Sequence, residues 1–297
     1  MEDNQNKYVI TLIGADHVTL TNDILDKLYR KLDSVNMQAD TAKWLCEGKA
    51  ADIEVDTGGS SIALPMLDEP VDIILQPSAG RKKRLLISDM DSTMIEQECI
   101  DELADAIGIK EKVAHITELA MNGELDFESA LTERVALLEG LPADKLQEVF
   151  DSHISLMPGS KTLVTTMKAH GAKAVLVSGG FTFFTKAVSD QLGFDEHRAN
   201  ELDMNDDVLS GKVILPILGK EAKQAYLHEF AENYGMSLDQ TLAVGDGAND
   251  LPMLQAAGLG VAYHAKPNVQ KQVSCCINHS DLSSLLYIQG YHKDEFL

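Results

Sequence analysis

The chain has 297 residues, of which 44% are hydrophobic and 24% charged, a composition typical of ordinary globular proteins. It is long enough for two domains, or for one large domain with an insertion. Acidic residues number 47 against 25 lysines and arginines, which gives a formal net charge of −22. So acidic a chain is not expected to bind nucleic acid or an anionic membrane surface, and a phosphorylated substrate would need cations placed locally.

The chain shows no sign of a membrane-spanning or secretory segment. No apolar stretch reaches the roughly 18 residues of a spanning helix, and residues 1–6 are polar and acidic rather than a signal peptide. The four cysteines, Cys46, Cys99, Cys275 and Cys276, lack CxxC spacing, and adjacent cysteines cannot easily pair with each other. We therefore expect free thiols in a reducing cytoplasm.

Residues 1–80 predict a small α+β domain. A strand-like run at 7–13 is followed by apolar residues at helical spacing over 24–32, and further strands follow, the last at 71–75. This order resembles the ferredoxin-like ACT modules attached to many amino-acid enzymes, although residues 57–70 do not have the pattern of the second helix of such modules. We favour a packing or dimerising role over an effector site, so a homodimer stays open.

The segment 77–84 follows and marks the domain boundary; its last four residues, 81–84, are all basic. In so acidic a chain, its four cations favour a solvated linker over a nucleic-acid contact. From about 97 to 157, apolar residues recur at helical spacing in successive segments. A helical block inserted after the first strand of an α/β core is typical of a cap over a site. The second domain is therefore predicted to span 81–297, with the cap at about 97–157.

Three buried apolar runs in this domain each end in acidic or small residues. The runs are 85–87, 174–177 and 242–244; the residues that follow are Asp89 and Asp91, then Ser178, Gly179 and Gly180, then Asp246 and Asp250. Such runs are typical of strands covered on both faces. If the strands are parallel neighbours in a doubly wound, Rossmann-like sheet, their carboxyl ends share the edge where ligands bind.

Carboxylates gathered at such an edge predict a metal site. Four carboxylates cannot all be ionised in a small cleft without a compensating cation. Hard oxygen ligands select Mg²⁺, which binds one or two carboxylates plus a substrate phosphate. Asp89 and Asp246 are the expected ligands. No set of histidines and cysteines has the spacing of a zinc site.

The same residues suit phosphoryl transfer. A metal beside Asp89 would make its carboxylate a workable nucleophile toward phosphorus, which gives an aspartyl-phosphate. Asp91 can protonate the leaving oxygen and later take a proton from the attacking water. Ser178, with main-chain N–H groups made accessible by Gly179 and Gly180, can hold phosphoryl oxygens.

A lysine on the predicted helix at 220–234 would stabilise the transferring group, and Lys223 and Lys220 are equally eligible on sequence alone. Each signal has an ordinary explanation. A Ser-Gly-Gly is usually a turn, a helix lysine is usually solvated, and the loop at 245–250 could be a turn or a calcium loop, although it lacks the rest of an EF-hand. Their common position after buried strands favours the joint interpretation.

These motifs resemble those of haloacid-dehalogenase-like phosphatases, and among them the phosphoserine phosphatases most closely. The resemblance covers about residues 84–290 and is carried by Lys223 and by the segments 89–93, 126–135, 178–180, 245–250 and 265–267, with Glu98. It implies that Asp89 is the nucleophile and Asp91 the acid and base. It also implies that Mg²⁺ is held by Asp89, the main-chain carbonyl of Asp91, and Asp246.

The resemblance further assigns residues to substrate binding. Glu98 and Arg134 would hold the amino-acid part, because Glu98 can accept the ammonium and Arg134 can bind the carboxylate with its bidentate fork. Phe127 would shield the closed site from water, and Asn249 would contact phosphate. Asp250 would orient the lysine or a metal-bound water. Without the resemblance, Arg134 would be taken for a surface cation and Phe127 for a core residue.

The expected function is therefore Mg²⁺-dependent hydrolysis of O-phospho-L-serine to L-serine and phosphate, the last step of serine biosynthesis. Two alternatives stay open. One is a phosphatase of the same family for another small phosphomonoester, such as phosphothreonine or a sugar phosphate. The other is an amino-acid-sensing protein whose function lies in residues 1–80.

Overall fold

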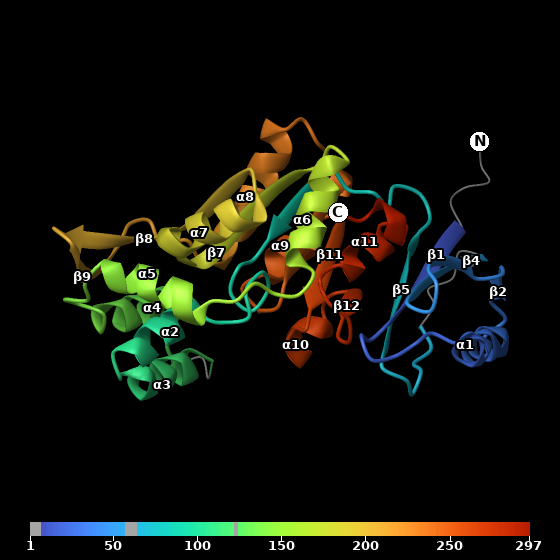
Figure 1. The fold of residues 1–297 in the computed structure, drawn as a ribbon, viewed down its shortest axis with the longest axis horizontal. Coiled ribbons are helices and arrows are strands. Elements are labelled where there is room, and N and C mark those ends of the chain that lie inside the picture. The colour runs from blue at the N-terminus through green and yellow to red at the C-terminus, as the bar shows by residue number, and fades with distance from the viewer. Residues whose placement is uncertain (1–6, 57–63, 122–123) are drawn as a thin grey trace.

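Two sheets organise the part of the chain that the computed structural model describes, residues 7–56, 64–121 and 124–297 (Figure 1). The smaller sheet lies at one end of an elongated molecule, the larger sheet in the middle, and a group of helices at the other end. Three regions therefore follow one another along the long axis: the amino-terminal sheet with its helix, the core, and the helical insert.

The amino-terminal sheet has the order β2-β4-β1-β5 in the described residues, with β3 also paired to β4. Its strands are β1 (Lys7–Gly14), β2 (Gln38–Ala39), β3 (Lys43–Cys46), β4 (Ala50–Asp56) and β5 (Val71–Pro77). Helix α1 (Asn22–Ser34) buries its apolar residues, spaced at helical intervals, against this sheet. The order of strand, helix and strands follows the sequence prediction. Residues 57–63 lie outside the described residues, and 64–70 contain no helix.

The core sheet has the order β12-β11-β10-β6-β7-β8-β9, and its neighbouring strands are parallel except for the β8–β9 hairpin. Its strands are β6 (Leu85–Ser88), β7 (Lys173–Phe181), β8 (Glu196–Asn205), β9 (Val208–Ile214), β10 (Thr241–Gly245), β11 (Leu259–Tyr263) and β12 (Cys275–Ile277). Strand β6 is central: Leu86 pairs with Ala174 of β7 on one side and with Leu242 of β10 on the other. The three predicted strands are therefore parallel neighbours.

Helices cover both faces of this sheet. They are α6 (Ser160–Ala169), α7 (Thr182–Leu192), α8 (Lys220–Asn233), α9 (Leu251–Ala256), α10 (Pro267–Gln270) and α11 (Ser284–Ile288), with short 3-10 helices at Leu238–Gln240 and Lys293–Glu295. Leu86 packs with residues of α6, α7 and α11, whereas Leu85 and Ile87 pack with α8 and α9. Because successive side chains of a strand point to opposite faces, a continuous apolar run is what a strand between two helical layers needs. The predicted doubly wound α/β core is confirmed.

The helical insert lies between β6 and β7. It consists of α2 (Cys99–Ala106), α3 (Lys110–Met121), α4 (Phe127–Ala136) and α5 (Asp144–His153). Helix α4 begins with Asp126 as its N-cap, whose carboxylate accepts the Ser129 N–H at 3.0 Å. It packs against β9, so the β8–β9 hairpin links the insert to the core.

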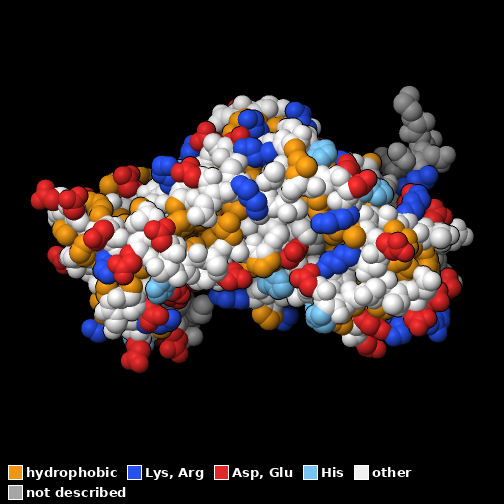
Figure 2. Space-filling view, in the orientation of Figure 1, with side chains coloured by type: hydrophobic (Ala, Val, Ile, Leu, Met, Phe, Trp, Pro, Cys, Tyr) orange, Lys and Arg blue, Asp and Glu red, His pale blue; other side chains and the backbone are white. Residues whose placement is uncertain are grey.

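The amino-terminal domain packs against the carboxyl-terminal part of the core, where β5 contacts β12 and β1 contacts α11 (Figure 1). On the face shown in Figure 2, acidic and basic side chains are interspersed, and acidic ones are most frequent toward the two ends. All four cysteines carry free thiols. Within the described ranges, no helix has both the length and the apolar character needed to cross a membrane.

Candidate active site

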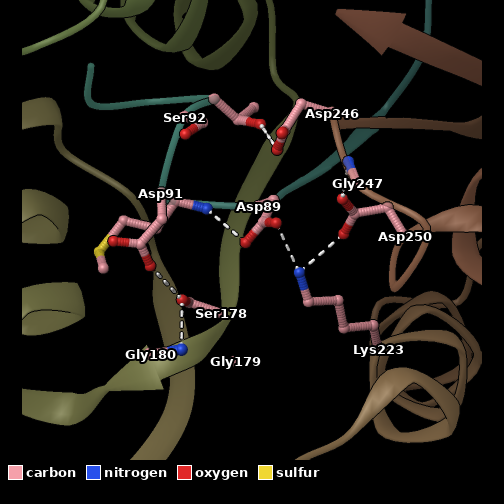
Figure 3. A network of polar contacts seen from close by, with 12 residues as sticks. Asp89, Asp91, Ser92, Ser178, Gly179, Gly180, Lys223, Asp246, Gly247 and Asp250 are labelled. Carbon is pink, nitrogen blue, oxygen red and sulfur yellow. Dashed lines mark hydrogen bonds and ion pairs between the residues drawn. The ribbon is translucent and has the colours of Figure 1, made fainter. Parts of the chain in front are cut away.

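The carboxyl ends of β6, β7 and β10 bring the predicted site residues together (Figure 3). The main-chain N–H of Asp89 donates to the Val244 carbonyl at 3.0 Å, which holds the end of β6 beside that of β10. As a result, carboxylate oxygens of Asp89, Asp246 and Asp250 all lie within 4.8 Å of one another. Asp89 and Asp246, which are 157 positions apart in the chain, thus share one acidic cluster.

Lys223 of α8 lies inside this cluster. Its side chain is 1% exposed, and Nζ lies 2.7 Å from Asp89 Oδ2 and 2.7 Å from Asp250 Oδ1 (Figure 3). The second Asp250 oxygen accepts the Gly247 N–H at 3.0 Å. Lys220, the alternative lysine, is exposed and pairs with its neighbour Glu221 at 3.6 Å. The structure therefore places Lys223, and not Lys220, at the site, with Asp250 holding it in position.

Burial and mutual repulsion set the electrostatics of the cluster. Burial raises the pKa of Asp89 well above its usual value, the Asp250 charge adds to this, and Lys223 opposes it. The same two leading causes raise the pKa of Asp246 to about 6. For Lys223, burial disfavours the charge, but the Asp250 and Asp89 carboxylates outweigh it and raise the pKa. Three carboxylates thus face one ammonium group.

This donor set fits a hard divalent cation. It offers only carboxylate oxygens, and ionisation of all three acids would leave negative charge in excess. Asp250 already uses both oxygens, for Lys223 and Gly247. Asp246 accepts one long hydrogen bond, from the Thr93 hydroxyl at 3.3 Å, and keeps its other oxygen for a cation. Asp89, like Asp250, has both oxygens engaged, by Lys223 Nζ at 2.7 Å and by the Met90 N–H at 2.7 Å, so Asp246 is the member of the cluster with an oxygen left over in the described chain.

Asp91 lies two residues from Asp89 but has a different environment. Its Oδ2 accepts the Ser178 hydroxyl at 3.0 Å, and its Oδ1 accepts the Cys99 N–H at 2.9 Å. The Ser178 oxygen in turn accepts the Gly180 N–H at 2.8 Å, so a chain of hydrogen bonds runs from β7 to Asp91 (Figure 3). Asp89 therefore faces the lysine and the acidic cluster, whereas Asp91 faces the serine.

Two glycines at the site leave no room for a side chain. A Cβ on Gly180 would lie 2.8 Å from Asp91 Oδ2 and 3.0 Å from Ser178 Oγ. A Cβ on Gly247 would lie 2.2 Å from the side-chain oxygen of Asn249, so that amide folds back against the loop. Glycine suits both positions because it has no Cβ, so polar side chains can approach the backbone closely.

Residues of the helical insert reach the same site. The Phe127 ring lies against Gly179, where an added Cβ would come within 3.1 Å of it. Arg134 is half-buried and donates only to the Ala130 carbonyl (3.2 Å) and the Thr117 hydroxyl (3.5 Å) among the described residues. Burial lowers its pKa, and nearby carboxylates, including that of Glu98, oppose this. Its guanidinium is thus available for another anion.

Glu98 begins the insert and keeps an exposed side chain. Nevertheless, desolvation by the protein around its carboxyl group, followed by repulsion from Asp91, raises its pKa to about 7. Its Oε1 accepts the Ser92 hydroxyl at 2.7 Å. Ser92 has a φ of +54°, in the left-handed region that non-glycine residues rarely adopt. The sequence predicts no individual role for Ser92 or Thr93. Their position directly after Asp91 is the one feature of the sequence that could have placed them at the site.

The chain matches a known family of hydrolases. A sequence model of the haloacid dehalogenase-like hydrolase family matches residues 86–255, from β6 to α9. The chain belongs to this family.

Relatives and solved structures extend the comparison. The chain is 47% identical over 208 residues to a phosphoserine phosphatase of Polaromonas sp., covering 68% of this chain and 88% of that protein. It is 34% identical over 305 residues to a phosphoserine phosphatase of Saccharomyces cerevisiae, covering 98% of each. A crystal structure of a HAD-family hydrolase from Salmonella enterica serovar Typhi has a TM-score of 0.86 at 29% identity, and covers 98% of this chain and all of that one.

Proposed function

We propose that the chain is a Mg²⁺-dependent phosphomonoesterase that hydrolyses O-phospho-L-serine to L-serine and phosphate. One observation carries the chemistry: Asp89 and Asp91 lie side by side in different environments, one against Lys223 and the acidic cluster, the other against Ser178. Neighbouring carboxylates with different surroundings can divide the roles of nucleophile and acid or base. The relatives named above, which are phosphoserine phosphatases, support the choice of substrate.

Asp89 and Asp246, with the Asp91 main-chain carbonyl, would hold Mg²⁺. When bound, the ion offsets the repulsion between the nucleophilic carboxylate and the phosphoryl oxygens. Asp89 attacks phosphorus, the bond from phosphorus to the serine oxygen breaks, and Asp91 gives that oxygen a proton. Water then attacks the phosphorus of the aspartyl-phosphate and gives a proton to Asp91. The bond from phosphorus to the Asp89 oxygen breaks, which frees the Asp89 carboxylate and releases phosphate. Lys223 stabilises the charge on the transferring group.

The substrate's three charged groups match groups around the site. Glu98 would accept the ammonium, and Arg134, which lacks a carboxylate partner within the described chain, would bind the carboxylate. Ser178, the N–H groups of Gly179 and Gly180, and Asn249 would hold the phosphoryl group. Phe127, against Gly179, would exclude water when the insert closes.

We also propose the domain organisation predicted from the sequence: residues 1–80 as an ACT-like packing or dimerising domain, 81–297 as the phosphatase, and about 97–157 as its cap. The separate amino-terminal sheet, and the insert that brings Phe127 to Gly179, support this division. A cytoplasmic location is proposed from the four free thiols.

A substrate panel tests the function. Phosphate release from O-phospho-L-serine should require Mg²⁺, stop with EDTA, and be lost in Asp89→Asn, whereas Asp190→Asn, on the surface in a pair with Lys186, should behave as wild type. Undiminished turnover in Asp89→Asn would refute the mechanism.

Arg134→Ala tests the substrate assignment. It should lower kcat/KM for O-phospho-L-serine about 10- to 100-fold, the cost of a charge-assisted hydrogen bond, but leave O-phosphoethanolamine, which lacks the carboxylate, nearly unaffected. Equal losses on both substrates, or faster turnover of phosphothreonine or a sugar phosphate, would point to another phosphomonoester.

A further inference from the structure

A buried carboxylate of the amino-terminal domain holds a loop of the core. Asp72 of β5 is 3% exposed, and the loop at 278–280 wraps around it. Its Oδ1 accepts the Asn278 N–H at 2.7 Å, and its Oδ2 accepts the N–H and the hydroxyl of Ser280 at 3.0 and 2.7 Å. The N–H of His279 lies 3.2 Å from both oxygens. Main-chain N–H groups arranged in this way stabilise a buried negative charge.

The loop held by Asp72 contacts the segment that supports a metal ligand. The Ser280 carbonyl accepts Nε2–H of His264 at 3.0 Å. His264 follows β11 and has a φ of +43°, and its own N–H donates to the Ile277 carbonyl at 2.8 Å. Two residues later, the Lys266 N–H donates to the main-chain carbonyl of Asp246 at 3.3 Å. Asp72 is thus connected to the Asp246 loop through three successive sets of hydrogen bonds: from Asp72 to the loop at 278–280, from that loop to His264, and from Lys266 to Asp246.

The same loop also contacts the point where the chain returns from the insert to the core. The Leu282 N–H donates to the Pro158 carbonyl at 3.1 Å. Gly159 has a φ of +79°, and a Cβ there would lie 2.4 Å from the Ser283 nitrogen, so the two backbones are in close contact. Beside them, the Met157 N–H donates to the Met94 carbonyl at 2.9 Å, joining the two chain segments that connect the insert to the core.

We propose that Asp72 is a positioning residue for the active site. By holding the loop at 278–283, it fixes both the segment that carries the Asp246 loop and the connection of the cap to the core. The amino-terminal domain would then be needed for catalysis without contributing any group to the reaction. The inference rests on the proposed phosphatase site, but not on which phosphomonoester that site prefers.

Asp72→Asn is the test variant, because the amide keeps the size of the carboxylate but turns an NH₂ group toward N–H and O–H donors. Asp52→Asn is the matched control. Asp52 is also nearly buried in the same domain, where it pairs with Arg81 at 2.6 Å and accepts the Thr11 hydroxyl at 2.6 Å, but it makes none of the contacts to the loop. The control loosens the docking of the domain without disturbing the loop directly.

We expect Asp72→Asn to lower kcat about 10- to 100-fold and to raise the half-activating Mg²⁺ concentration, as losses of outer-shell partners do. Both effects should appear with O-phospho-L-serine and with para-nitrophenyl phosphate. Amide hydrogen exchange should accelerate at 245–250 and 157–160. His264→Asn is a second variant, chosen because asparagine tolerates the positive φ of this position. It should reproduce the Mg²⁺ effect and the faster exchange at 245–250, and should leave exchange at 157–160 unchanged.

Two results would overturn the inference: wild-type kcat and exchange in Asp72→Asn, or an equal loss in Asp52→Asn, which would mean that any weakening of the domain contact suffices. If Asp72→Asn fails to fold, His264→Asn decides, and an unchanged Mg²⁺ requirement there refutes the connection to Asp246. If the wild type does not turn over O-phospho-L-serine, the proposed substrate is wrong. The role of Asp72 can still be tested in that case, with para-nitrophenyl phosphate and with hydrogen exchange.

Discussion

Lys223 is the residue on which the charge balance of the site depends. It is the one ammonium group in contact with the cluster within the described chain, and it pairs with both Asp89 and Asp250 at 2.7 Å. A buried carboxylate without a partner is far more costly than an exposed one. The cluster is therefore stable only with the lysine and, at neutral pH, is favoured further by a bound cation.

Replacing this lysine should destabilise the metal-free protein. We expect Lys223→Met to lower the free energy of unfolding in EDTA by about 3 kcal/mol or more, the typical cost of breaking a buried ion pair. Added Mg²⁺ should raise the melting temperature of the variant more than that of the wild type. Lys220→Met, on the exposed side of the same helix, is the control and should melt as the wild type does. Equal melting of both variants would contradict this prediction.

Glu98 should make substrate binding depend on pH. Its pKa is raised to about 7, so the carboxyl loses its proton as pH rises through that value. Only the anion attracts the substrate ammonium, so KM for O-phospho-L-serine should fall between about pH 6 and pH 8. Glu98→Gln should have a higher KM without this pH dependence. A wild-type KM that rises over this range would contradict the prediction. A substrate that lacks the ammonium group is the control, and its KM should not show this fall.

At the scale of elements, β7 does more than complete the sheet. It continues through Ser178, Gly179 and Gly180 to Phe181, and its pairing with β8 is irregular between Val177 and Phe181. The strand therefore carries the Ser178 hydroxyl and two glycines to the edge where Asp89 and Asp91 lie. Helix α4 places Phe127 against the same stretch.

A methyl group on Gly180 should disturb this edge. Its Cβ would lie 2.8 Å from Asp91 Oδ2, so Gly180→Ala should displace the carboxylate from Ser178 and lower kcat about 100-fold, as misplacement of a reacting group by about 1 Å can do. Gly219→Ala is the matched control, because its Cβ would meet its nearest neighbours at an ordinary 3.9 Å. Thermal unfolding should show that both variants fold. A Gly180→Ala variant with full activity would argue against a role for this edge.

At the scale of the molecule, the two domains are joined by polar contacts as well as by the contact of β5 with β12. Arg81 of the linker makes a bidentate pair with Asp52 and donates to the carbonyls of Tyr287 and Ile288 in α11. Gln76 of β5 also donates to the Ile288 carbonyl. The predicted solvated linker is therefore wrong for Arg81, which is largely buried because it serves both domains; Lys82 and Arg84 are exposed.

Removing Arg81 should weaken the junction without stopping catalysis. Arg81→Leu leaves Asp52 with little charge compensation, so unfolding should begin at a lower temperature, with a loss of about 3 kcal/mol. Turnover at a temperature where the variant is folded should stay close to that of the wild type, since neither residue contacts the loop at 278–283. Lys82→Leu, in an exposed pair with Glu295, is the control. A loss of turnover as large as in Asp72→Asn would contradict this prediction.

Local patterns of apolar and polar residues were enough to predict the order of buried strands, the helical insert and the carboxylates at the strand ends. The sequence also identified nearly every side chain now found at the site. Local patterns left Lys223 and Lys220 equally eligible, because the two lie about one turn apart on a helix. The family resemblance pointed to Lys223, and in the fold Lys223 is buried at the site whereas Lys220 is exposed. Two further contacts could not be predicted from the sequence: Asp91 accepts a hydrogen bond from Ser178, and Asp72 holds the loop at 278–280. These contacts link residues far apart in the chain, and the local spacing of apolar and polar residues does not predict which distant residues will be in contact.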